Sequence, residues 1–189
     1  MSTVTKLTLD QYEQMIADGA FAGSPRSRLE LIEGEIREMS PIGPPHSEIV
    51  DLLNDWSARL LPITKVRVRV QQPIRLPLQD SEPEPDITWV HKKNYSRHHP
   101  EPREVYLLIE VAETSLVFDR NEKSRLYAEA GIAEYWIVDV ASREILVYRP
   151  LDSAHYHAPQ VFDLADEIHP LAFPQVTLPV KMLFEDFES

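Results

Sequence analysis

The stretch "EVYLLIEVA" (residues 104–112) decides the fold, because it is the most apolar strand-like run of the chain. Leu107, Leu108 and Ile109 follow one another without the polar alternation of a half-exposed strand. The run therefore predicts a strand that is buried on both faces, at the centre of a sheet. Glu110 interrupts it, and an unpaired carboxylate there would cost several kcal/mol or lose its charge. We therefore expect Glu110 to have a partner.

Upstream of this strand the sequence predicts a helix, a hairpin and a second helix. Thr8 begins a capping-box pattern at the start of a predicted helix over residues 8–18. Apolar and polar residues alternate on both sides of a Glu-Gly pair, which predicts a β-hairpin over residues 28–39. Apolar residues then recur at helical spacing and predict an amphipathic helix over residues 46–61.

The next segment, "KVRVRVQQ" (65–72), alternates strictly and predicts a strand with two different faces. Valines form one face, and Lys65, Arg67, Arg69 and a glutamine form the other. A solvated sheet face is the favoured interpretation of the basic side. The alternative is a basic strip that contacts phosphate.

Downstream of the central strand, a helix is predicted over residues 119–130. Asp119 suits its N-cap, and Gly131 suits the position just after its end. The remaining expected elements are strands over 86–90, 133–140 and 143–150, weaker strand signals near 155–163, and a final apolar stretch over 180–187. The fold class is therefore α/β (α+β), with a mixed central sheet flanked by helices and an N-terminal helix and hairpin.

Composition limits the class of protein further. A chain of 189 residues fits a single domain over residues 1–189. It has no cysteine, which excludes disulfides and thiolate zinc sites. No stretch approaches the roughly 20 apolar residues of a membrane span, and the N-terminus lacks a signal-peptide pattern, so we expect a cytoplasmic protein without a membrane partner. The net charge of −12 argues against broad polyanion binding, but not against a local basic groove or a metal site.

Two carboxylates and a lysine are the candidate chemical groups. Asp86 opens one predicted strand and Glu110 lies in the next, so adjacent strands could bring the two acids together. Carboxylates a few Å apart repel unless a proton or a divalent cation lies between them, which suggests an oxygen-liganded Mg²⁺ or Mn²⁺. Lys123 follows one helical turn after Asp119, with Tyr127 on the same helix face. Taken alone, Asp86 would be a turn acid and Lys123 a solvated lysine.

With these residues the chain resembles the PD-(D/E)XK nuclease superfamily, whose motif is an Asp at a strand start and an acid-x-Lys on the next strand. More closely, it resembles the Uma-two-type restriction endonuclease family. The matching segments are "LELIEGEIREMSPIGPPH" (29–46), "EPD" (84–86), "LLIEVAETS" (107–115), "DRNEKSRLYAEAGIAEYWIVD" (119–139) and "VYRP" (147–150). The resemblance implies a restriction endonuclease-like core over about residues 8–150. Beyond it we expect C-terminal strands and a short helix over residues 151–189. It also implies a homodimer.

The chain departs from the superfamily motif at one position. Ala112 stands two residues after Glu110, where the strand lysine is expected. In the Uma-two-type family the lysine moves to the following helix, where this chain has Lys123. The resemblance also places Glu30 and His46 near the site. The alternatives are an exposed hairpin acid for Glu30 and an ordinary helix-start residue for His46.

The sequence thus predicts a metal-dependent endonuclease that hydrolyses phosphodiester bonds, with DNA as the substrate. Asp86, Glu110 and the carbonyl of Val111 are the predicted ligands of Mg²⁺ or Mn²⁺. Lys123 is predicted to help deprotonate the attacking water or to balance charge in the transition state. The rival hypothesis is a nuclease-like module that binds nucleic acid or protein without cutting. A third is an enzyme that acts on another phosphoester.

Overall fold

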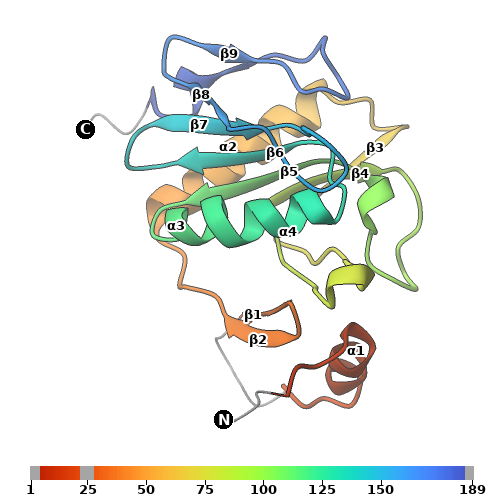
Figure 1. Ribbon diagram of the computed structural model, residues 1–189. Coiled ribbons are helices and arrows are strands. Elements are labelled where there is room, and N and C mark those ends of the chain that lie inside the picture. The colour runs from red at the N-terminus through yellow and green to blue at the C-terminus, as the bar shows by residue number, and fades with distance from the viewer. Residues whose placement is uncertain (1–4, 22–27, 186–189) are drawn as a thin grey trace.

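The computed structural model describes residues 5–21 and 28–185. Its centre is a six-stranded sheet with the strand order β3-β4-β5-β6-β7-β8, which Figure 1 shows. All neighbouring strands are antiparallel except β5 and β6, so the predicted mixed sheet is confirmed. The strands are β3 (Val66–Val70), β4 (Ile87–His91), β5 (Val105–Ala112), β6 (Tyr135–Asp139), β7 (Glu144–Tyr148) and β8 (Gln160–Phe162).

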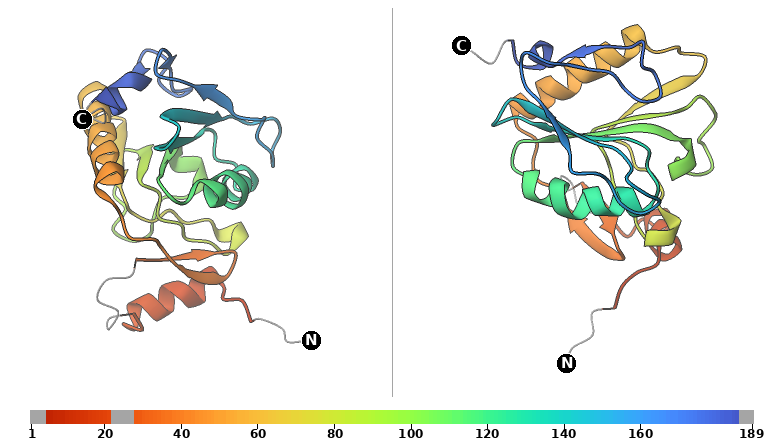
Figure 2. Two further views of the ribbon diagram at one scale, coloured as in Figure 1. Left: turned by 90° about the vertical axis from the view of Figure 1, so that its left-hand side faces the viewer. Right: turned by 45° about the horizontal axis from the view of Figure 1, so that its top comes forward.

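Helices cover both faces of the sheet, as Figures 1 and 2 show from three directions. On one face lies α2 (Pro44–Leu60), which starts two residues before the predicted helix because prolines suit a first helical turn. The other face carries α3 (Leu116–Phe118), the π-helical turn η3 (Asp119–Lys123) and α4 (Ser124–Glu129). This second group is the crossover that the parallel pair β5 and β6 requires.

Large aromatic side chains fill the space between the sheet and each helical layer. On the α2 side, the rings of Trp56 and Trp89 lie 5.2 Å apart, and Trp136 lies 6.2 Å from Trp56. On the α4 side, Tyr127 and Tyr135 are fully buried with their rings 4.9 Å apart. Each such side chain removes a large apolar area from water, so these two layers fix β5 at the centre of the molecule.

The helix that follows β5 begins earlier than the sequence suggests. The prediction of Asp119 as its N-cap is wrong, because Ser115 takes that position and Asp119 lies inside the helix with 2% exposure. The carboxylate accepts a hydrogen bond from the Ser115 hydroxyl at 2.5 Å instead of capping backbone amides. The predicted end is confirmed, since Gly131 follows the helix with φ +79°.

The N-terminal elements form a small layer below the sheet in Figure 1. Helix α1 (Leu9–Ala17) starts at the predicted capping box of Thr8. The predicted hairpin is confirmed as β1 (Leu29–Ile32) paired with β2 (Glu35–Glu38). Its two turn residues both have positive φ, 48° and 79°, as a two-residue type I′ turn requires.

The basic face of β3 is only partly solvated. Lys65 is exposed, but Arg69 is 9% exposed, so the favoured interpretation of a solvated face is wrong at this position. The reason is the loop after β4, which folds back over the strand. The Tyr95 ring of this loop lies 5.6 Å from the guanidinium carbon of Arg69. The backbone amide of Arg75 donates a hydrogen bond to the carbonyl of Pro100, which holds the end of the loop.

The C-terminal part packs beyond the α2 side of the sheet with short elements. Strand β8 lies within the weaker strand signals, and the predicted short helix is confirmed as the 3-10 turn η4 (Val180–Leu183). Residues 186–187 of the predicted apolar stretch lie outside the described residues. The other short elements are η1 (Pro77–Gln79), η2 (Pro102–Glu104), β9 (Glu167–Ile168) and β10 (Leu178–Pro179). Among the described residues, no helix has the length and apolarity to cross a membrane.

Candidate active site

The structure brings the two predicted acids together across the strands β4 and β5. Ile87 pairs with Ile109, which sets Asp86 opposite Glu110. The amide of Val111 donates a hydrogen bond of 2.9 Å to the Oδ2 atom of Asp86. The sequence predicts this proximity because a single polar loop links the two strands. The pairing register supplies the physical reason for it.

Three donors hold the Asp86 carboxylate in place. Besides the amide of Val111, the Nε2 atom of His46 lies 2.9 Å from Oδ1, and the side-chain amide of Gln71 donates to the same oxygen at 3.1 Å. Burial raises the pKa of Asp86, but these hydrogen bonds outweigh burial and lower it below its ordinary value. Asp86 is therefore an anion in the folded protein. Gln71 was not predicted, although the pairing of β3 with β4 sets it beside Asp86.

Glu110 has the partner that its sequence position demanded. The Nζ atom of Lys123 donates to its Oε1 atom at 2.9 Å, and the Tyr127 hydroxyl donates to the same oxygen at 2.9 Å. Burial, together with the charges of neighbouring carboxylates, nevertheless raises the pKa of Glu110 to about 8. Burial therefore disfavours the ionised form of Glu110 more than the lysine stabilises it.

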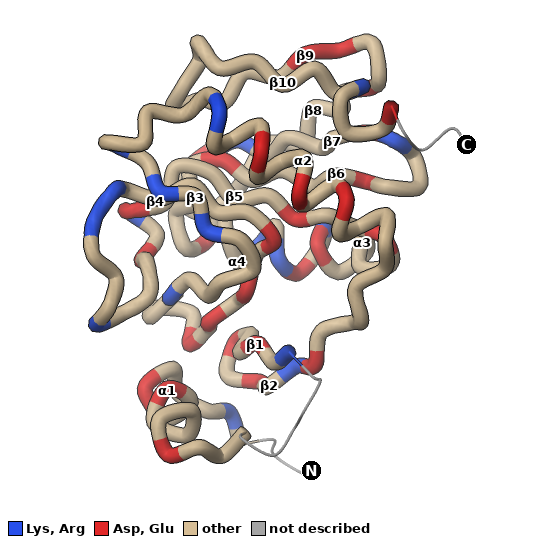
Figure 3. The backbone as a smooth tube through the Cα atoms, turned by 180° about the vertical axis from the view of Figure 1, so that it is seen from behind, with Lys and Arg blue, Asp and Glu red and all other residues tan. Residues whose placement is uncertain are grey.

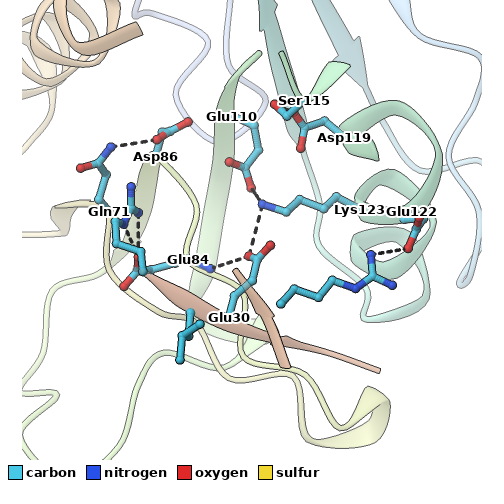
Figure 4. Close-up of polar contacts among 12 residues, drawn as sticks. Glu30, Gln71, Glu84, Asp86, Glu110, Ser115, Asp119, Glu122 and Lys123 are labelled. Atoms are coloured by element: carbon cyan, nitrogen blue, oxygen red, sulfur yellow. Dashed lines mark hydrogen bonds and ion pairs between the residues drawn. The ribbon is translucent and has the colours of Figure 1, made fainter. Parts of the chain in front are cut away.

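Lys123 lies between two acids from different parts of the chain, as Figure 4 shows. Its Nζ atom is 3.4 Å from the Oε2 atom of Glu30 in β1, which is 4% exposed. The alternative of an exposed hairpin acid is therefore wrong for Glu30. Burial lowers the pKa of Lys123, but the surrounding carboxylates outweigh it and raise the pKa above its ordinary value. Lys123 is thus a buried, protonated cation.

Asp119 is a further acid of the site that sequence reasoning assigned only to helix capping. Burial raises its pKa above the ordinary value, and Figure 4 shows it facing the same region as Glu110. Asp119 and Lys123 are both buried and mark the two ends of the π-helical turn η3. Such turns are rare and occur frequently at functional sites. The sequence pattern gave no signal of the extra residue per turn.

These side chains line a pocket of about 350 Å³. Six carboxylates line it, against three Lys or Arg side chains. Two of these cations are paired outside the acidic cluster, Arg28 with Glu84 and Arg37 with Glu122, each at 2.7 Å. Within residues 5–21 and 28–185, no group of three or more His, Asp or Glu side chains has the arrangement of a metal site. The donor chemistry and the excess negative charge nevertheless fit a divalent cation with oxygen ligands.

Comparison with known proteins places the chain among nuclease-like proteins. The family model "Uma2: Putative restriction endonuclease" matches residues 9–181. A crystal structure from Anabaena variabilis ATCC 29413, described as a putative nuclease belonging to DUF820, superposes with a TM-score of 0.70. That match covers 95% of this chain and 98% of the other at 20% sequence identity, which shows a common fold. Among curated proteins, no sequence matches this chain.

Proposed function

Because the chain belongs to the Uma2 family of restriction endonuclease-like proteins, we propose that it hydrolyses phosphodiester bonds in DNA with the help of a divalent metal ion. One observation carries the proposal. Asp86 and Glu110 lie opposite each other on adjacent strands, and Lys123 reaches Glu110 from the neighbouring helix. This arrangement, which draws on three separate elements, supports the acid, acid and lysine set that the resemblance implies.

Asp86 and Glu110 would hold Mg²⁺ or Mn²⁺, together with the carbonyl of Val111. Carboxylate and carbonyl oxygens are the ligands that these ions prefer. A divalent ion there would supply a more acidic water and neutralise charge on the scissile phosphate. The lining of the pocket supports this role, because six carboxylates face three Lys or Arg side chains there.

Lys123 would stabilise the negative charge that develops on the phosphate in the transition state. Of the two roles predicted for it, this one fits the raised pKa, because a lysine that retains its proton donates hydrogen bonds and does not accept a proton. The lysine would take the place that Ala112 leaves empty on β5. The Lys123 ammonium contacts Glu110. A lysine on the helix can therefore reach the same acid that a lysine two residues along the strand would lie beside.

His46, Glu30 and Tyr127 would be positioning residues. His46 holds Asp86, while Tyr127 holds Glu110 through its hydroxyl. Glu30 anchors the second side of the Lys123 ammonium. Each of them fixes a group that would touch the substrate or the metal.

Cleavage of plasmid DNA by the purified protein tests the proposal. We expect nicking or linearisation with Mg²⁺ or Mn²⁺, none with EDTA, and a loss of at least a hundredfold in Asp86→Asn and Glu110→Gln. Glu129→Gln is the matched control, because this exposed acid on α4 lies outside the pocket. Equal cleavage by all three variants would identify a contaminating nuclease and contradict the proposal.

A module that binds without cutting is the second candidate, favoured by the hydrogen bonds that already occupy both oxygens of Asp86. Calorimetric titration with Mg²⁺ and Mn²⁺ separates the two candidates. Only the nuclease needs to bind a metal ion, and Asp86→Asn should abolish that binding. A homodimer remains part of the proposal on the strength of the family resemblance, and a cytoplasmic location remains an expectation from the composition of the chain. Light scattering of the purified protein tests the dimer.

A further inference from the structure

Two segments of the chain, residues 65–71 and 91–100, carry positive charge without any carboxylate. We call them together the basic surface. Their Lys and Arg residues are Lys65, Arg67, Arg69, Lys92, Lys93 and Arg97. The whole chain has a net charge of −12, so this local charge is opposite in sign to that of the molecule. A concentration of one sign against such a background raises the local potential for a ligand of the opposite sign.

The two segments form one continuous surface at the edge of the sheet. Strand β3 is the edge strand, and its Val66 pairs with His91 at the end of β4. The amide of Lys92 donates to the carbonyl of Lys65 at 2.8 Å. Figure 3 shows the Lys and Arg positions gathered over β3 and the loop after β4.

Several of these charges are available to a ligand. Lys65, Lys92 and Arg97 are exposed, and none of the three forms an ion pair with a carboxylate in the part of the chain that the structure describes. Lys93, by contrast, is paired with Glu104. Three exposed cations without internal partners are a surface to which an anion can bind at little desolvation cost.

The interior of the basic surface is fixed by aromatic contacts. The Tyr95 ring lies 5.6 Å from the guanidinium carbon of Arg69 and 5.0 Å from the ammonium of Lys93. Arg69 also contacts the ring nitrogen of His99 at 3.4 Å. These contacts hold the loop against β3, so its exposed cations start from a defined arrangement and lose less entropy on binding.

The basic surface lies on the same strands as the acidic pocket, but at the opposite end of β4. Asp86 precedes β4 and Lys92 follows it, a separation of six residues or about 20 Å along the strand. DNA carries one phosphate per strand every 3.4 Å along its axis, so this distance corresponds to about six base pairs. The pairing of Arg67 with Val90, and the hydrogen bond from Gln71 to Asp86, place this side of β3 on the face that carries Asp86.

We propose that the basic surface binds the phosphate backbone of double-stranded DNA about six base pairs from the position of the acidic pocket. The inference rests on the proposed nuclease function and adds the surface on which the DNA is held. A duplex fits better than a single strand because its stiffness keeps phosphates at a fixed distance from the pocket. The surface thereby explains how a chain of net charge −12 holds a polyanion.

Two triple variants with equal net charge test the inference. Lys65→Gln, Lys92→Gln and Arg97→Gln are combined in the first, which removes three charges from the basic surface. Lys6→Gln, Arg59→Gln and Lys181→Gln are combined in the second, which removes three exposed charges elsewhere. Binding of a fluorescent 20-base-pair duplex is measured in EDTA by anisotropy at several salt concentrations, for both variants and the unchanged protein.

We expect the basic-surface variant to bind on the order of a hundredfold more weakly at about 0.1 M salt, and its salt slope to fall by about 3. The control variant should stay within about threefold of the unchanged protein. Equal losses in both variants, no loss in the first, or tighter binding of single-stranded RNA than of the duplex would each overturn the inference.

Cleavage assays on the same proteins separate this inference from the proposed function. If the unchanged protein binds duplex through the basic surface but never cuts with Mg²⁺ or Mn²⁺, the nuclease proposal fails and the binding surface stands. If it cuts, and the basic-surface variant binds and cuts as the control does, the binding surface alone is refuted.

Discussion

At the scale of single residues, the central feature is a lysine buried among acids. The side chains of Lys123, Glu110 and Glu30 are 4%, 5% and 5% exposed. A buried ion pair is weak evidence for stability, because desolvation opposes the attraction. Removing only one partner is costly, however, since the other charge remains in a poor solvent. The contribution of these side chains to stability can therefore be measured separately from their contribution to activity.

We expect Lys123→Met to lower the free energy of unfolding by about 1–3 kcal/mol at pH 7, because it removes the hydrogen bond to Glu110 and the cation beside Glu30. Combining it with Glu110→Gln should cost less than the sum of the two single changes, by on the order of 1 kcal/mol, because each change alone already breaks the contact between the two side chains. Urea unfolding of the two single variants and the double variant measures this coupling. Strict additivity of the two single effects would contradict a direct Glu110–Lys123 pair.

At the scale of elements, the N-terminal hairpin brings an acid to a site built mainly on the sheet. The turn at Gly34 lies against the segment before α1: a Cβ atom there would be 2.7 Å from the Cβ of Lys6 and 2.8 Å from the carbonyl of Leu7. The same hairpin presents Glu30 to Lys123. A change in the turn should therefore affect both the packing of the N-terminal layer and the site.

Gly34→Ala should destabilise the protein by about 2–4 kcal/mol, which combines the cost of positive φ with a clash against backbone. Gly131→Ala is the matched control: its φ is also +79°, but a Cβ there meets nothing within 4 Å. This control should cost only about 1 kcal/mol. Thermal and urea unfolding of both variants give the comparison. Equal costs would show that the close approach at Gly34 has no energetic consequence.

Local patterns predicted most elements because their information is local. Alternation identified β3 and the β1–β2 hairpin, the capping box placed the start of α1, and a glycine marked the end of α4. The helix after β5 was placed too late, because the π turn and the Ser115–Asp119 hydrogen bond depend on tertiary packing. Periodicity assumes a regular helix and has no means of detecting an inserted residue.

The candidate site was predicted in part for the same reason. Three site residues stand out in the sequence. Asp86 is an acid at a strand start, Glu110 is an acid inside an apolar run, and Lys123 lies in a segment that resembles the nuclease family. Gln71 does not stand out, since its contact with Asp86 exists only once β3 pairs with β4 in the observed register. Asp119 was noticed but given the wrong role. Strand pairing and helix irregularity are the information that one sequence lacks.

At the scale of the whole molecule, excess negative charge in the pocket should couple metal binding to stability. If Asp86 and Glu110 bind Mg²⁺ only in the folded state, a concentration one hundred times the dissociation constant should stabilise the protein by about 2.7 kcal/mol. We expect the melting temperature to rise with Mg²⁺ in the unchanged protein and to remain constant in Asp86→Asn. Differential scanning calorimetry measures both. An equal rise in the two proteins would place the ion elsewhere.

The contact between α1 and the rest of the molecule includes another buried acid, which does not line the pocket. Glu82 is 4% exposed, and its Oε2 atom lacks a hydrogen-bond partner among the described residues. Burial, followed by the nearby charge of Glu13 on α1, raises the pKa of Glu82 to about 7. Arg75 donates to Glu13 and Asp10, which holds the helix against this acid.

Protonation of Glu82 should therefore couple the stability of the molecule to pH. Below the ordinary glutamate pKa of about 4.5, the carboxyl is protonated in both the folded and the unfolded state and contributes nothing to the difference. Between about 4.5 and 7 the folded state retains a proton that the unfolded state has lost, so stability falls as pH rises. We expect a loss of about 1–3 kcal/mol across this window.

Glu82→Gln should remove this part of the pH dependence, because the amide has the shape of the protonated acid and does not titrate. Urea unfolding of both proteins in EDTA, at pH values from 5 to 8, gives the free energies. The variant should match the unchanged protein near pH 5 and exceed it by about 1–3 kcal/mol near pH 8. Parallel pH profiles would show that Glu82 is ionised throughout. Since α1 supplies Glu13, selective protection of α1 in hydrogen exchange at low pH would locate the effect at this contact.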